Sequence, residues 1–530
     1  MKRIFTLLFC TTSAFVAAQT IDLVKDIRQG MGGSDMSPST EYKGKLYFGA
    51  SNFFDGDELW VSDGTEPGTF MLKDINPEPL NGSGVYDLVQ VGEVLVFLAS
   101  NGATGAELWK TDGTSEGTVL LKDIHPTESS NPMYLSRIGN YVVFDAADGV
   151  HGNELWVTDG TTDGTFLLKD INPNGSSYPY GFTEFDGRLY FQADNGTDGV
   201  ELWATDGTQA GTVLVKNIWD AGDSSPRNFK TFGDKLFFRA DHSNGDELYV
   251  TDGTSEGTVL FKEINPNPNE GSGVNEMVEL NGKLYFRART DAEGMELWSS
   301  DGTPDGTVMV KDIFPGPNDS FPGALTVYNE KLYFQAQDSQ LNTELWVSDG
   351  TSDGTYMLKD IHPTSYSAPI DFQVYNGLLY FIAIDGTNGS EIWATDGTEV
   401  GTAKQFPDID QENTFYLIPH WKVYNGSLYF KATFLATGDE LYKLTSEPLS
   451  ANDPTGNQFA IYPNPANSEI HLSIDNDTIR TCEIYSISGQ LVISVDSAAP
   501  IDISSLSAGL YLVKIETETQ QKMVKKLIVK

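Results

Sequence analysis

The segment VELWATDGTQAGTVLVKNI at residues 200–218 decides the fold of this chain, because versions of it recur along most of the sequence. Its leading glutamate returns at intervals of 46 to 49 residues. The nine positions are Glu58, Glu107, Glu154, Glu201, Glu247, Glu296, Glu344, Glu391 and Glu440. A regular period of roughly 40 to 50 residues is typical of a propeller or a solenoid that repeats one supersecondary unit.

Each repeat predicts four short antiparallel strands. In one unit, VNEMVEL (274–280) meets an Asn-Gly turn and returns as KLYFRA (283–288), which is a strong hairpin signal. The ELW segment then leads through a second turn, DGTPDGT (301–307), to the closing strand VMVKDI (308–313). Four strands per repeat, without any helical periodicity, predict one blade of a β-propeller.

The two ends of the repeat array predict how it closes. IDLVKDI (21–27) matches the last strand of a unit but has no ELW segment before it, whereas GDELYKLTSEP (438–448) supplies a third strand and lacks the fourth. Pairing these two ends would remove exposed sheet edges. We therefore predict an all-β chain with a closed propeller of about nine four-stranded blades over residues 19–447, in which the N- and C-terminal strands share one blade.

Two residues of the motif favour structural roles. The aromatic of ELW is Trp in seven units and Tyr in two, which predicts packing between neighbouring sheets rather than stacking on a ligand. The glutamate before it occurs in all nine units. A catalytic or metal-binding ring of glutamates is the alternative, but one active site needs only one pair, so nine copies favour a structural hydrogen bond.

The turn after ELW contains Asp-Gly-Thr in eight units. Asp bonds to the backbone two residues on and Gly supplies a positive φ, so the motif is explained as turn chemistry. Calcium binding by these oxygen-rich turns is the alternative, although the ligand spacing of an EF-hand loop is absent; no other cofactor or metal is predicted. The lysine of the closing strand, such as Lys169, is expected to be exposed and to prevent edge-to-edge pairing.

The longer, variable segments between the second and third strands and between units are where we expect a binding site. Several carry an aromatic residue beside Asn, Ser or Asp, a combination that suits a glycan. These candidate binding residues are Tyr178, Tyr180, Trp219, Phe314, Phe321 and Tyr366. Arg239 and Arg287, at equivalent mid-strand positions, either grip a carboxylate-bearing ligand or pair with carboxylates of the repeat, and the repetition favours the second. The common catalytic motifs are absent, so no catalytic residue is predicted.

Composition and the N-terminus limit the function. With 75 Asp and Glu against 34 Lys and Arg, the net charge of -41 argues against nucleic-acid binding. Residues 1–18, MKRIFTLLFCTTSAFVAA, have the pattern of a secretory signal peptide. Its removal would leave Cys482 as the one cysteine, so no internal disulfide is expected. No later segment has the length of apolar residues that a membrane helix needs.

The motif GxELWxxDGTxxGT resembles the family named after it, the ELWxxDGT repeat proteins, over roughly residues 20–447. This resemblance implies a secreted or surface protein and transfers no activity. After a linker at residues 448–458, residues 459–530 resemble the type A C-terminal sorting domain of the type IX secretion system. The motifs that carry this resemblance are FAIYPNPANSEIHLSI (459–474), ISGQLV (487–492), DISSLSAGLYLVKI (502–515) and KKLIVK (525–530).

The second resemblance implies a small β-sandwich, a Bacteroidetes-type bacterium and passage across the outer membrane through the type IX machinery. Gly509, Tyr511 and Lys514 match the GxYxxK core of that family and are the implied recognition residues. The leading hypothesis is a secreted or cell-surface binding or adhesion protein whose propeller face contacts a glycan or a protein. The alternatives are an extracellular polysaccharide-degrading hydrolase or lyase with an asymmetric carboxylate pair, and a structural protein of a surface layer.

Overall fold

The computed structural model describes most of the chain as strands and connecting segments. The described residues are 5–8, 17–30, 32–267, 270–387, 389–405, 420–434, 438–448, 459–463, 466, 468–474, 478–486, 491–495, 500–506, 509–519 and 522–529. They divide into two compact units, which are Leu23–Lys443 (the repeat unit) and Met1–Asp22 with Leu444–Lys530 (the terminal unit). Most of the predicted signal peptide (residues 1–4 and 9–16) and of the linker (449–458) lies outside the described residues.

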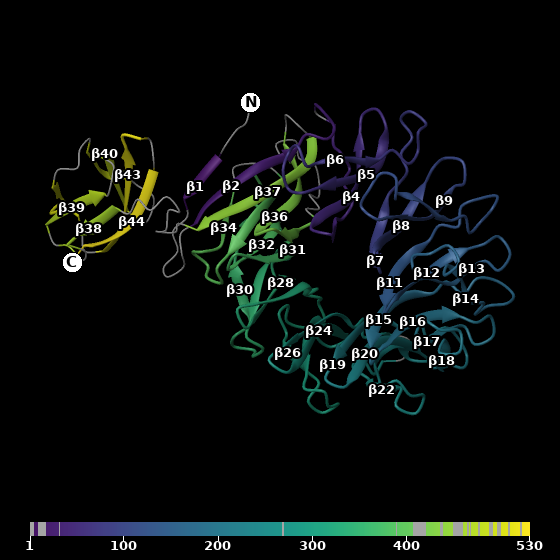
Figure 1. Ribbon diagram of the computed structural model, residues 1–530. Helices are drawn as coiled ribbons and strands as arrows, with labels where there is room; N and C mark the ends of the chain where they lie inside the picture. Colours follow the sequence, from purple (N-terminus) through teal and green to yellow (C-terminus); the bar gives the residue numbers. More distant parts are fainter. Residues whose placement is uncertain are drawn as a thin grey trace. The chain divides into compact units, whose positions relative to one another are not determined.

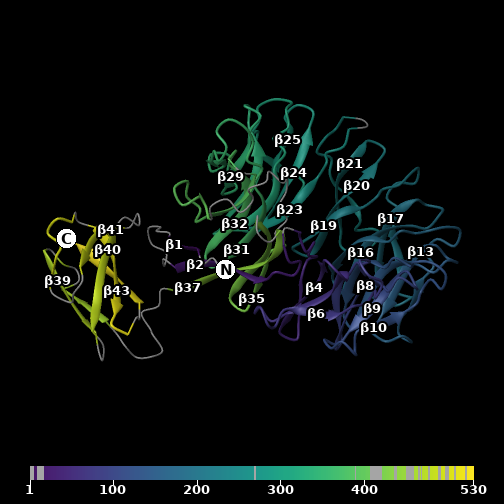
Figure 2. The ribbon, with the colours of Figure 1, turned by 90° about the horizontal axis from the view of Figure 1, so that it is seen from above.

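The repeat unit consists of four-stranded sheets that follow one another in chain order (Figure 1). A typical sheet has the order β15-β16-β17-β18 and antiparallel pairing. Its strands are β15 (Tyr180–Phe185), β16 (Arg188–Asp194), β17 (Val200–Thr205) and β18 (Val213–Lys216). The first hairpin turns at Asp186 and Gly187, both with positive φ, as the sequence predicts for an Asp-Gly turn. The same succession of sheets is seen from above in Figure 2.

Seven further sheets repeat this arrangement. Their strands are β3 (Thr40–Tyr42), β4 (Lys45–Asn52), β5 (Gly56–Ser62) and β6 (Phe70–Lys73); β7 (Tyr86–Val91), β8 (Val94–Ser100), β9 (Ala106–Thr111) and β10 (Val119–Lys122); β11 (Met133–Ile138), β12 (Tyr141–Ala147), β13 (Asn153–Thr158) and β14 (Phe166–Lys169); β19 (Arg227–Phe232), β20 (Lys235–His242), β21 (Gly245–Thr251) and β22 (Val259–Lys262); β23 (Asn275–Leu280), β24 (Lys283–Thr290), β25 (Gly294–Ser300) and β26 (Val308–Lys311); β27 (Gly323–Tyr328), β28 (Lys331–Gln337), β29 (Thr343–Ser348) and β30 (Tyr356–Lys359); β31 (Ile370–Tyr375), β32 (Leu378–Ile384), β33 (Ser390–Thr395) and β34 (Ala403–Lys404).

One sheet, in the order β1-β2-β37-β36-β35, contains the strands that begin and end the repeat region together with β1, which precedes that region in the sequence. Its strands are β1 (Phe5–Leu8), β2 (Ala17–Lys25), β35 (Lys422–Tyr424), β36 (Ser427–Phe434) and β37 (Gly438–Pro448). The backbone N–H groups of Ile27 and Arg28 donate to the carboxylate of Glu440, each at 2.9 Å. The strand that opens the repeat region therefore lies beside the strand that ends it.

The hydrophobic cores lie between consecutive sheets. One core joins Val143, Leu155 and Leu168 of one sheet to Phe191 and Trp203 of the next. Trp203 is 6% exposed, and five of the other six ELW tryptophans are 6–7% exposed. The prediction that this aromatic packs between sheets is confirmed, and burial of so large a side chain once per repeat holds the array together.

The repeated glutamate is fully buried, and in seven repeats its carboxylate binds the isoleucine N–H of the segment that follows its sheet. The carboxylate of Glu154 accepts hydrogen bonds from the Ile171 N–H at 2.7 Å and from the Ser177 hydroxyl at 2.7 Å. The same pair of donors serves Glu107, Glu201, Glu296 and Glu344. The predicted structural hydrogen bond is confirmed at these positions, where it satisfies a buried acid and a buried backbone group together.

The Asp-Gly-Thr turn is closed by its own side chains, and a lysine from the preceding sheet binds it. Asp206 Oδ1 accepts from the Thr208 N–H at 2.9 Å and from the Thr208 hydroxyl at 2.6 Å. Lys169 Nζ donates to the Thr212 carbonyl at the end of the same turn, at 2.9 Å. The expectation of an exposed lysine is wrong. Lys169 is half-buried because its ammonium group satisfies a carbonyl of the next sheet.

The described C-terminal part of the terminal unit contains two sheets with one shared core. The strand orders are β38-β39-β42 and β41-β40-β43-β44. The strands are β38 (Phe459–Tyr462), β39 (Glu469–Ile474), β40 (Ile479–Ser486), β41 (Leu491–Val495), β42 (Ile501–Asp502), β43 (Gly509–Thr517) and β44 (Lys522–Val529). Buried residues of both sheets, including Ile470, Cys482 and Val513, form the core, as a small β-sandwich requires.

Candidate functional site

A groove of about 510 Å³ lies where the sheet that ends with β18 joins the sheet that begins with β19. One wall comes from the connecting segment after β18, and the other comes from the end of β20, the turn after it and the first residue of β21. The lining residues are Trp219, Gly222, Asp223, Asp241, His242, Ser243 and Gly245. We call this feature the Trp219 groove.

The repeats explain why the groove forms here. Trp219 occupies the position that follows the closing strand, where five other repeats have Asn or His. At the preceding junction this residue is Asn172, whose amide donates to the Ser176 carbonyl at 3.1 Å. A Cβ atom on Gly196 of the next sheet would lie 2.4 Å from Asn172 Oδ1, so side chain and loop are in direct contact. The Asn172 side chain therefore fills its junction, whereas the junction at Trp219 remains open as a groove.

The connecting segment holds the indole of Trp219 in place. The Gly222 N–H donates to the Trp219 carbonyl at 3.1 Å, which makes a tight turn. A Cβ atom at residue 222 would lie only 3.0–3.2 Å from three carbon atoms of the indole ring. The ring therefore lies directly against Gly222, and any larger residue at position 222 would have to displace it.

Carboxylates and a histidine supply the polar lining. Asp223 Oδ1 accepts from the Val200 N–H at 2.9 Å, while Asp223 Oδ2 has no donor among the described residues. Asp241 is paired with Arg227 through two hydrogen bonds, of 2.7 and 3.2 Å. His242 Nδ1 accepts from the Asn244 N–H at 3.2 Å, and its Nε2 is buried without a partner in the described chain. An aromatic face beside such acceptors suits the apolar face and the hydroxyl groups of a sugar.

The structure distributes the other predicted aromatic residues over several junctions. Tyr178, Phe321 and Tyr366 lie in connecting segments and are 63%, 50% and 48% exposed. Tyr180 is the first residue of β15 and not a loop residue, and its ring lies 4.7 Å from that of Tyr134. Phe314 is half-buried and occupies the position of Trp219 in another repeat. Of the six aromatic candidates, only Trp219 lines the groove.

Sequence reasoning missed Asp223, Asp241 and His242. Asp241 and His242 belong to the next sheet, more than 20 residues after Trp219, so local composition does not connect them with it. Aligning the repeats at the position of Trp219 would have marked this junction, because a large aromatic there replaces Asn or His. Of the two predicted arginines, Arg239 pairs with Asp246 at 2.5 Å, and Arg287 has no ion-pair partner among the described residues.

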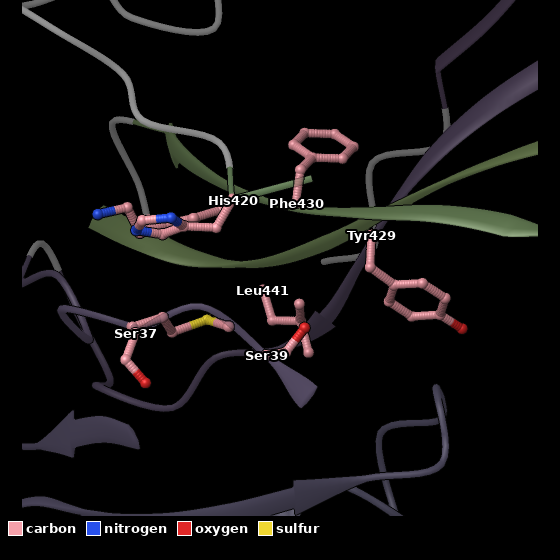
Figure 3. Close-up of a pocket in the computed structure, with 8 residues that line it drawn as sticks. Ser37, Ser39, His420, Tyr429, Phe430 and Leu441 are labelled. Atoms are coloured by element: carbon pink, nitrogen blue, oxygen red, sulfur yellow. The ribbon is translucent and has the colours of Figure 1, made fainter. Parts of the chain in front are cut away.

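A smaller pocket lies between the segment at residues 36–39 and strands β36 and β37. Figure 3 shows His420, Tyr429, Phe430 and Leu441 around it, together with the two serines of that segment. Its volume of about 10 Å³ is enough for one water molecule. Burial lowers the pKa of His420, and the charge of Lys431 lowers it further, so this histidine is neutral near pH 7. The pocket is too small for a ligand.

The described residues contain no group of three or more His, Cys, Asp or Glu side chains that is arranged to hold a metal ion. In the same part of the chain, no helix has the length and apolar character needed to cross a membrane.

The predicted sorting residues lie on or beside the core of the terminal unit. Gly509 pairs in register with Val529 at the start of β43. Tyr511 is 9% exposed and belongs to the core, whereas Lys514 Nζ lies 3.2 Å from Glu483 Oε2. Residues 460–530 match the model of the secretion system C-terminal sorting domain. This sorting domain indicates export to the outer cell surface or the medium, and it implies interaction with the type IX secretion machinery.

Comparison with curated proteins found no match. Among solved structures, the chain is similar to one of two prolyl endopeptidases, with 10% identity, a TM-score of 0.36, and coverage of 82% of this chain and 55% of that chain. The chain thus spans about half the length of that peptidase.

Two further structures are similar at the same low level. The β-propeller domain of the Trilobed protease from Pyrococcus furiosus has 14% identity, a TM-score of 0.32, and coverage of 60% of this chain and 96% of that chain. The extracellular domain of a putative hybrid two component system from B. thetaiotaomicron has 10% identity, a TM-score of 0.34, and coverage of 100% and 74%.

Proposed function

We propose that this protein is a secreted or cell-surface binding protein that holds a glycan in the Trp219 groove. The observation that carries the proposal is the groove of about 510 Å³ in which Trp219 lies beside Asp223 and Asp241. An aromatic ring and a few fixed polar groups are the usual means by which a concave site orients a small ligand. The sorting domain supports a location where extracellular glycans are present.

The size of the groove favours a glycan over a protein ligand, and the net charge of the chain limits the kind of glycan. A volume of about 510 Å³ suits a short oligosaccharide. A standard protein interface is broader and flatter, since it buries about 800 Å² on each partner. The net charge of -41 further disfavours a strongly anionic partner. A largely neutral glycan is compatible with both the volume of the groove and the negative charge of the chain.

We also propose that the sheets of the repeat unit form one closed propeller of nine blades. Its support is a set of contacts between the first and last sheets. The Tyr424 hydroxyl donates to the Gly44 carbonyl at 2.5 Å, and Lys443 Nζ donates to the Gly64 carbonyl at 3.1 Å. The Tyr375 hydroxyl similarly donates to the Gly426 carbonyl at 2.9 Å, which joins the last two sheets. Small-angle X-ray scattering tests this proposal, because an open arc has a larger radius of gyration than a ring.

The glycan proposal is tested by applying the full-length mature protein to a glycan array and measuring the affinity of the retained oligosaccharide by calorimetry. We expect Trp219→Ala to weaken binding at least about tenfold through loss of the stacking surface. Phe314→Ala is the matched control, since Phe314 holds the same position in another repeat, and it should leave binding unchanged. An array without any retained glycan contradicts the proposal. Release of shortened products from the bound polysaccharide would instead support the enzyme alternative.

A further inference from the structure

In two of the sheets, a cationic side chain in the middle of the second strand has an acidic partner on the neighbouring strand. Arg239 on β20 lies 2.5 Å from Asp246, measured from Nη2 to Oδ1. Lys431 occupies the same position on β36, and its Nζ lies 3.8 Å from Asp439 Oδ2. In both sheets, the acidic residue directly precedes the repeated glutamate of the neighbouring strand. A cation at this position is therefore normally paired within its own sheet.

Arg287 on β24 occupies the same position without such a partner. The residue that precedes its repeated glutamate is Met295, whose thioether cannot form an ion pair. Arg287 Nη1 reaches only the Pro322 carbonyl, at 3.5 Å, and its Nε is buried with no hydrogen-bond partner in the described chain. A guanidinium group stays charged, and partial burial without a counter-charge costs free energy. The position is thus suited to an anion from outside the chain.

Phe321 places an exposed aromatic ring next to Pro322, whose carbonyl Arg287 contacts. Its backbone φ is +46°, and its side chain is 50% exposed. Equivalent residues with the same left-handed backbone include Gly84, Asn131 and Ala368, which are smaller, and Tyr178, which is also an exposed aromatic residue. A bulky aromatic in this conformation is strained, and its exposure recovers little by burial. A contact with a ligand would explain why an aromatic residue stands here.

We infer that Arg287 and Phe321 form a second ligand site, which takes a sugar residue that carries a carboxylate. The inference rests on the proposed glycan-binding function and adds the chemical class of one sugar in the ligand. The carboxylate would pair with the guanidinium group of Arg287, and the sugar ring would pack against Phe321. The net charge of -41 repels a polyanion, so the ligand is a mostly neutral glycan with isolated carboxylates.

The test uses the full-length mature protein on a glycan array in which each carboxylated oligosaccharide is paired with its neutral parent. The wild type should prefer the carboxylated members, and Arg287→Gln should bind them about tenfold more weakly and lose the preference. The fold accommodates this change, because Gln192 and Gln335 occupy the same position in other sheets. Met295→Asp should also remove the preference, since it gives Arg287 an internal partner like that of Arg239.

Tyr178→Ala is the matched control for Phe321→Ala. Tyr178 has the same strained, exposed conformation, but its segment follows the sheet in which Asp145 holds the position of Arg287. Phe321→Ala should weaken binding of the carboxylated members, and Tyr178→Ala should not. A preference that survives both Arg287→Gln and Met295→Asp overturns the second site, as does equal binding of charged and neutral members. Arg287-dependent binding of acidic peptides in place of sugars also overturns it. An array that retains no glycan contradicts the proposed function itself.

Discussion

The junction at Asn172 and the junction at Trp219 have the same scaffold and different surfaces. In both, a buried glutamate binds an isoleucine N–H and a serine hydroxyl of the connecting segment, through Glu154 in one and Glu201 in the other. At the surface, Asn172 contacts the loop of the next sheet, whereas Trp219 lines a groove of about 510 Å³. The repeat therefore separates the residues that hold the sheets together from the residues that face a ligand.

The largest effect is expected from removal of the scaffold. Glu201→Ala removes the acceptor of the Ile218 N–H and of the Ser224 N–H, and leaves the Ser224 hydroxyl with the Val200 carbonyl alone. We expect it to lower the free energy of unfolding by about 3 kcal/mol, and Glu154→Ala to do the same, because each substitution removes the hydrogen-bond acceptor of several buried polar groups. Trp219→Ala should cost less than half as much. Urea denaturation measures all three, and an equal loss in the Trp219 variant would show that scaffold and surface are not separate.

The next effect contrasts two glycines of the same two junctions. Gly196 has a φ of +76° and contacts Asn172, so Gly196→Ala should destabilise the protein by about 1–2 kcal/mol. Gly222 lies outside the left-handed region and supports the indole of Trp219. Gly222→Ala should therefore weaken glycan binding several-fold with little loss of stability. Thermal unfolding and calorimetric titration distinguish these outcomes. Unchanged binding by the Gly222 variant would mean that the position of the indole is unimportant.

A smaller effect concerns pH. Burial raises the pKa of Glu247 to about 7, against the opposing effect of the hydrogen bond from the Ile264 N–H, and it acts similarly on Glu58, Glu154, Glu296 and Glu440. Because the folded state binds these protons more tightly than the unfolded state, their contribution is complete below about pH 4.5 and is lost as the pH rises through 7.

The melting temperature should therefore fall between pH 5 and pH 8. Glu247→Gln should show a smaller fall than the wild type, since one of the titrating groups is gone. A melting temperature that rises over this interval in both proteins would contradict the assigned direction of these pKa shifts.

The smallest effect is expected for calcium, whose binding by the Asp-Gly-Thr turns remains a prediction. The side-chain hydrogen bond from Thr208 lowers the pKa of Asp206, and the backbone N–H of Thr208 adds to this effect. Since the turn is closed by its own donors, we expect EDTA to change the melting temperature by less than about 2 °C. A loss of several degrees that calcium chloride reverses would assign the ion to these turns.

Much of the fold could be predicted because the evidence for it is local. The interval between repeated glutamates, the Asp-Gly and Asn-Gly turns, and the alternation within each strand predict four strands per repeat. The repetition itself identifies the buried glutamate as structural. The role of Lys169 could not be predicted, because its partner is the Thr212 carbonyl of the next sheet, 43 residues away.

The site was only partly predictable for the same reason. Trp219 stands out as an aromatic in a variable segment, but the end of β20, which contains Asp241 and His242, approaches it only when two sheets pack. Arg239 and Arg287 look equivalent in the sequence. They differ because the residue that precedes the repeated glutamate on the neighbouring strand is Asp246 in one sheet and Met295 in the other.

The most direct test of the account is a crystal structure of the protein with the oligosaccharide that the glycan array retains. We predict a sugar ring packed on the indole of Trp219, with a hydroxyl group within hydrogen-bond distance of Asp223. We also predict that the junction at Asn172 holds no sugar in the same crystal. A sugar bound at another junction, with the indole of Trp219 uncovered, would contradict the central claim that the change at residue 219 creates the binding site.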